Sequence, residues 1–108
     1  MVLADCEKAI RFTLPAVRIS VALELINRHG MLQADVAKAI GVAQAEVSKY
    51  VGGKYSARVR KVRLAVETAG LQLPIAEMVV RGAGAKELSR SIDKAASTQT
   101  IVEAALVP

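Results

Sequence analysis

The sequence predicts an all-α protein, a compact helical bundle of about one domain, and three observations lead to this class. Hydrophobic residues make up 53% of the 108 residues but aromatic residues only 3%. The core is therefore built from Ala, Val, Leu and Ile, which suits the close packing of helices. Apolar residues recur at helical intervals along most of the chain. No Asn-Gly or Asp-Gly pair, the strongest short signal of a β-hairpin, occurs.

The first part of the chain reads as four helices. We expect them at residues 14–28, 33–40, 44–51 and 57–69. In the first, Leu14, Val17 and Val21 follow a helical spacing, and Pro15 suits a first helical turn because its missing N–H is not needed there. A glycine follows the first and fourth of these segments as a stop signal.

The part after Gly70 has balanced charge and reads as two or three short helices, which we place at 74–81, 85–95 and 98–106. This division separates residues 1–69 from a C-terminal extension, residues 70–108. The apolar residues of the extension form either a dimerisation or partner-binding surface or simply more of the core. They are Leu71, Leu73, Ile75, Met78, Val79, Ile92, Ile101, Val102 and Leu106.

The positive charge of the chain is concentrated in one third of its length. The net charge is +5, and residues 31–66 account for all of it, with seven basic and two acidic residues. The rest of the chain carries eight of each. A local excess of this kind is the signature of a surface that binds a polyanion such as nucleic acid, although a solvated helix face gives the same count.

Gly41 interrupts a run that is otherwise helical from residue 33 to 51, although a glycine inside a helix costs about 1 kcal/mol relative to alanine. The spacing around it is that of a helix-turn-helix, in which Ala37 is small so that two helices approach closely. Gly41 then ends the first helix with a positive φ, which glycine adopts without strain. Val47 and Tyr50 face inward and hold the second helix to the rest of the domain.

The outward face of the helix at 44–51 is the candidate for contact with DNA bases. Projection at about 100° per residue places four residues on this face. They are Gln44, Ala45, Ser48 and Lys49. Amide, hydroxyl, methyl and ammonium groups of these types match base edges in the major groove. Four further basic residues are candidates for the DNA backbone, where they fix register without reading sequence. They are Lys38, Lys54, Arg58 and Lys61.

The segment "VAKAIGVAQAEVSKYVGGK", with "CEKAIRFTLPAVR" before it, resembles the helix-turn-helix domain of predicted archaeal transcriptional regulators of the lambda-repressor-like (XRE) class. The resemblance covers roughly residues 5–66. It implies a compact helical domain, dimeric operator binding and readout from the helix at 44–51. Leu32 and Ala43 depart from the family, whose members usually place a capping Ser or Thr there. The extension also lacks the cysteines that members often carry.

The function predicted from these features is that of a sequence-specific DNA-binding transcriptional regulator. We expect a homodimer on a pseudo-palindromic operator in double-stranded DNA, with a cytoplasmic, nucleoid-associated location. The alternative is a helix-turn-helix adaptor, for example an antitoxin-like protein, whose C-terminal helices bind a protein partner. The sequence identifies no small-molecule effector.

Enzyme, metal and membrane functions are not expected. His29 is the single histidine and lies at a predicted helix end, and the carboxylates are scattered, so no catalytic residues, metal site or cofactor are assigned. Cys6 is the single cysteine, which we read as a free thiol or, less simply, as half of an intersubunit bridge or shared metal site. The longest uncharged run is far too short to span a membrane.

Overall fold

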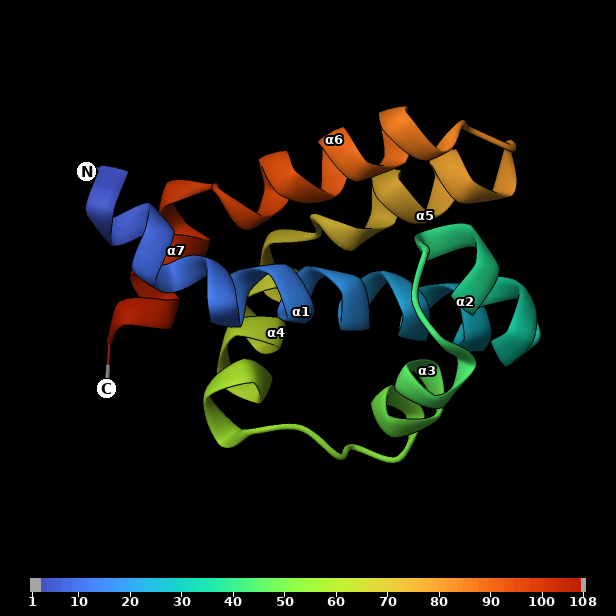
Figure 1. Ribbon diagram of the computed structural model, residues 1–108, viewed down its shortest axis with the longest axis horizontal. Coiled ribbons are helices and arrows are strands. Elements are labelled where there is room, and N and C mark those ends of the chain that lie inside the picture. Colours follow the sequence, from blue (N-terminus) through green and yellow to red (C-terminus); the bar gives the residue numbers. More distant parts are fainter. Residues whose placement is uncertain (1–2, 108) are drawn as a thin grey trace.

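One long central helix organises the protein (Figure 1). The structure is a computed structural model that describes residues 3–107, with side chains described from Glu7 onward, so that Cys6 lies outside the described side chains. Within this range the chain forms seven helices and no strand, which confirms the predicted all-α class. The helices are α1 (Leu3–Asn27), α2 (Gln33–Ile40), α3 (Gln44–Val51), α4 (Ala57–Ala69), α5 (Gln72–Val80), α6 (Ala85–Ala96) and α7 (Gln99–Leu106). All six later helices contact α1.

The first helix is much longer than the prediction of residues 14–28, because α1 continues through Pro15 instead of beginning there. The proline removes one backbone donor and crowds the carbonyl of Arg11. Arg11 lies on an exposed part of α1, where water can satisfy that carbonyl. The buried residues Ala9, Thr13, Ala16 and Val17 lie on both sides of the proline. Packing of this continuous face offsets the local cost, and the predicted helix start at Pro15 is wrong.

The α2 and α3 helices are two short segments of eight residues each, joined by a turn at 41–43. Gly41 has φ 74° and ψ 35°, so the predicted left-handed conformation is confirmed. The N–H of Val42 donates to the carbonyl oxygen of Ala37 at 3.0 Å, which closes the end of α2. Ala37, Val47 and Tyr50 are buried, as their positions in the motif predicted. The bounds predicted for α2, α3 and α4 also agree with the structure.

Helix capping differs between the α2–α3 pair and α4. Neither Leu32 nor Ala43 provides a side-chain cap, in agreement with the departure noted in the sequence. Ser56 caps α4, because its hydroxyl oxygen accepts a hydrogen bond from the N–H of Val59 at 3.2 Å. This serine was not among the residues predicted to have a structural role. The start of α4 is therefore fixed by its own cap, whereas α2 and α3 depend on packing.

The C-terminal helices begin close to their predicted positions and pack onto α1. Pro74 lies in the first turn of α5, which begins two residues before it, at a place where the missing N–H has no consequence. The apolar residues left open between a dimer surface and the core divide between the two. Ile75, Ile92, Ile101 and Val102 are buried within the chain, whereas Leu73 and Leu106 are exposed. The helical spacing could not tell these two fates apart, because both give apolar residues at the same intervals.

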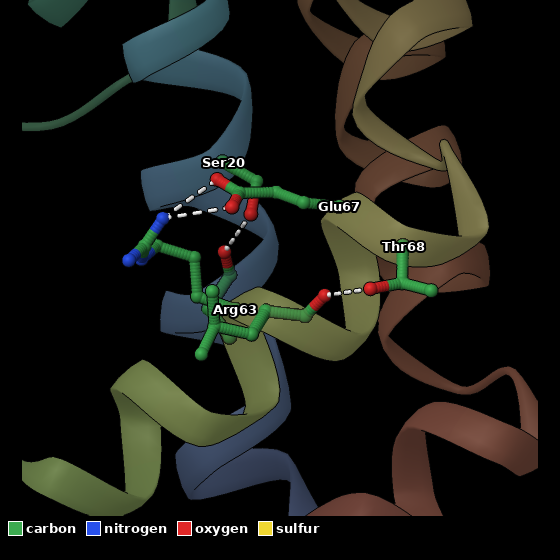
Figure 2. Close-up of polar contacts among 6 residues, drawn as sticks. Ser20, Arg63, Glu67 and Thr68 are labelled. Atoms are coloured by element: carbon green, nitrogen blue, oxygen red, sulfur yellow. Dashed lines mark hydrogen bonds and ion pairs between the residues drawn. The ribbon is translucent and has the colours of Figure 1, made fainter.

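A polar contact on α4 lies against the central helix (Figure 2). The guanidinium of Arg63 donates to both carboxylate oxygens of Glu67, each at 2.8 Å. The two side chains are only 17% and 30% exposed. The Nε of Arg63 is buried without a hydrogen-bond partner. The Glu67 carboxylate therefore supplies the hydrogen-bond acceptors and the negative charge that stabilise this guanidinium. Nearby, the Ser20 hydroxyl donates to the Ala16 carbonyl within α1 at 3.0 Å, which satisfies another buried polar group.

Removal of the Glu67 carboxylate is expected to destabilise the fold. Glu67→Ala leaves a largely buried guanidinium without its acceptor, and we expect a loss of about 1–2 kcal/mol in the free energy of unfolding. Glu77→Ala is the matched control, since the Glu77–Arg81 pair is exposed and 3.9 Å apart and such pairs contribute little. Urea denaturation of both variants measures the difference. Equal stabilities for the two would contradict a structural role for the α4 pair.

The left-handed turn gives a second stability prediction. A Cβ at Gly41 would meet no atom within 4 Å, so the cost of Gly41→Ala is conformational and not steric. We expect a loss of about 1–2 kcal/mol. Gly41→Asn should lose clearly less, because asparagine enters the left-handed region more readily. Thermal denaturation of the two variants beside the parent protein checks the order. An alanine variant as stable as the parent would show that the turn does not require this conformation.

Candidate nucleic-acid interface

The outward face of α3 carries all four residues predicted to read DNA bases. Gln44, Ala45, Ser48 and Lys49 are exposed, while Val47 and Tyr50 on the opposite face are buried. Gln44 and Ser48 are one helical turn apart, as are Ala45 and Lys49, so the four side chains form a compact patch. We call these four residues the α3 patch. In Figure 1, α2 and α3 lie together near one end of α1.

Two neighbours modify the chemistry of this helix. The Lys49 ammonium lies 3.6 Å from the Glu46 carboxylate, and both side chains are about half exposed. An exposed pair of this kind is weak, so Lys49 can exchange its partner for a phosphate or a base edge. Burial raises the pKa of Tyr50, the Glu46 carboxylate raises it further, and Arg18 acts in the opposite direction. Tyr50 therefore remains a neutral anchor between α3 and the core at ordinary pH.

The loop between α3 and α4 is held by Arg60, which was not among the predicted site residues. Its guanidinium donates to the carbonyl oxygen of Gly53 at 2.9 Å and lies 5.3 Å from the centre of the Tyr55 ring. Gly53 adopts a positive φ of 68° at this point. These contacts fix the path of the loop that carries Lys54, which is exposed. A phosphate contact from Lys54 would thus start from an ordered backbone.

Arg11 of α1, which also lies outside the predicted set, contacts the same aromatic ring as Arg58. The guanidinium carbons of Arg11 and Arg58 lie 5.1 Å and 4.9 Å from the centre of the Phe12 ring. Each distance is within the range of a cation–π interaction. Arg58, at the first turn of α4, was a predicted backbone contact, whereas Arg11 is remote in sequence and was missed. The sequence offered no signal for it, since only the fold brings the two arginines to one ring.

The remaining predicted basic residues occupy two different places. Lys38 is exposed on α2, beside the turn that leads to α3. The Lys61 ammonium donates to the carbonyl oxygen of Val107 at 3.2 Å, so it ties α4 to the C-terminal end of α7. Lys38, Lys54 and Arg58 are accordingly the backbone candidates nearest to α3 along the chain. Lys61 has an additional structural contact that its sequence position did not indicate.

The described residues show no arrangement suited to metal chemistry or membrane insertion. No group of three or more His, Cys, Asp or Glu side chains within the described range is placed to hold a metal ion. His29 is exposed at the end of the first helix. No helix formed by residues 3–107 has the length and apolar character needed to cross a membrane.

Comparisons with protein-family models, curated proteins and solved structures gave no match to this chain. The features that bear on function are therefore the α3 patch, the turn at Gly41 and the placement of the basic residues.

Proposed function

We propose that the protein is a sequence-specific DNA-binding regulator of transcription that inserts α3 into the major groove as a helix-turn-helix. The observation that carries the proposal is the division of α3 into two faces. Val47 and Tyr50 are buried against the core, and the α3 patch faces solvent with side chains suited to base edges. The net positive charge of the chain also falls within residues 31–66, the part of the sequence that contains α3, and an ordinary helical hairpin does not require such an excess.

The proposed roles follow from where each side chain lies. Gln44 pairs with the N6 and N7 atoms of adenine, and Ser48 and Lys49 contact neighbouring base edges or a phosphate. Ala45 packs against a thymine methyl group. Lys54 and Arg58 contact phosphates on one side of the groove and set the register of α3. Because counterions leave the DNA as phosphates are neutralised, affinity should fall steeply as salt concentration rises.

Substitution of one residue of each kind tests this assignment. An operator is first obtained by selection from random duplexes with the purified protein. Gln44→Ala should lose about 1–3 kcal/mol on this operator and little on random DNA, because only base reading is removed. Lys54→Ala should weaken both by a similar factor. Fluorescence anisotropy with the two duplexes measures these losses.

Matched controls come from the opposite part of the chain. Gln99→Ala on α7 and Lys94→Ala in the last turn of α6 remove exposed residues of the same types and should leave both affinities unchanged. If Gln44→Ala, like Lys54→Ala, lost as much affinity for random DNA as for the operator, base reading by α3 would be refuted.

We also propose that the regulator acts as a two-fold homodimer, since one helix-turn-helix reads only a few base pairs. We place its interface on α5, where Leu73 and Val80 are 50% and 51% exposed. The alternative, an adaptor whose C-terminal helices bind another protein, uses the same exposed apolar residues. Light scattering on the purified protein separates the two. A stable dimer supports the regulator, and a monomer that dimerises neither alone nor on the operator supports the adaptor.

A further inference from the structure

A cavity of about 280 Å³ opens between α1, α2 and α6, next to the turn that precedes α3. Its polar walls carry Arg18 from α1, Lys38 from α2, and Ser89 and Asp93 from α6. Its apolar wall includes Ile40, Leu88 and Ile92, each no more than 8% exposed. The cavity therefore combines charged groups on one part of its surface with an aliphatic lining on another. Binding sites for small organic molecules commonly have this composition.

Arg18 is the group in this cavity that most needs an explanation. Its side chain is half-buried, yet among the described residues it makes no hydrogen bond or ion pair. Asp93 lines the same cavity without pairing with it. A guanidinium whose N–H donors are not used within the protein can donate two parallel hydrogen bonds to a carboxylate. The fold thus presents two cations, Arg18 and Lys38, to an open space.

We propose that this cavity binds a small organic carboxylate with an apolar body. The guanidinium of Arg18 accommodates both oxygens of a carboxylate in a planar, bidentate arrangement, which Lys38 supports as a point charge. The apolar body packs against Ile40, Leu88 and Ile92. Asp93 disfavours a ligand with two negative charges, such as a phosphate, and Ser89 offers a hydroxyl to a polar substituent. A free α-amino group on the ligand would face Asp93.

The position of the cavity also connects it to the proposed function, and this step rests on that function. Lys38, Ile40 and Gly41 line the cavity and belong to the end of α2 and the turn before α3. A carboxylate held by Lys38 withdraws this ammonium from the DNA backbone. The ligand should then weaken duplex binding, and the duplex should weaken ligand binding by the same factor, as linkage requires.

The site is tested without DNA, so its outcome does not depend on the proposed function. The purified ¹⁵N-labelled protein is titrated separately with benzoate, leucine, inorganic phosphate and benzyl alcohol. We expect saturable shifts at residues 38–41 and 85–93 with benzoate or leucine, and none with phosphate or the alcohol. Leucine binding above benzoate would assign a role to Asp93. Shifts with neither carboxylate, or equal shifts with benzyl alcohol, would overturn the proposal.

A pair of variants identifies the group that binds the carboxylate. Arg18→Gln should weaken the carboxylate by about tenfold or more, because a charge-assisted pair is lost. Arg90→Gln removes an exposed arginine from α6 that does not line the cavity, and it should leave the affinity unchanged. Undiminished binding by a folded Arg18→Gln protein would overturn the assignment. Were that variant unfolded, Lys38→Gln, at an exposed position, should still weaken the carboxylate, and unchanged affinity there would overturn the proposal.

Discussion

The left-handed backbone at Gly41 determines the direction of α3, and the proposed interface depends on that direction. With φ 74° the chain turns sharply after α2, and the following helix packs Val47 and Tyr50 onto the core. The four residues of the α3 patch then face solvent. A continuous helix from residue 33 to 51 would distribute these side chains differently around its axis. The backbone conformation of Gly41 therefore determines which side chains of α3 are exposed to solvent.

The central position of α1 gives this turn its support. Because α1 contacts every later helix, the α2–α3 pair and the C-terminal helices share one core of small aliphatic residues. Such a core permits close approach of helices but contains few large side chains. The contacts of Tyr50 and of the Arg63–Glu67 pair are therefore important for the stability of the fold. The same arrangement places α6 beside the end of α2, and the cavity lined by Arg18 and Lys38 lies at this contact. A ligand there would lie next to the turn itself.

Much of the local structure was predictable, because short-range signals determine it. The bounds of α2, α3 and α4 and the conformation of Gly41 follow from spacing and glycine chemistry. The course of α1 through Pro15 was not predictable, since long-range packing offsets a local penalty. In the candidate site, the exposure of the α3 patch followed from helical periodicity. The contact of Arg58 with Phe12, which brings it beside Arg11, and the contact of Arg60 with Gly53 across a loop depend on the tertiary fold, and no pattern in the sequence indicates them.

The central claim is that the exposed face of α3 enters a DNA groove. Mapping of backbone amide shifts, as the labelled protein is titrated with its selected duplex, tests this contact most directly. The account predicts that the largest changes fall on residues 44–49 and on the loop at 53–58, with α7 nearly unaffected. Changes confined to α5 and α6, with the amides of α3 unmoved at saturation, would contradict it.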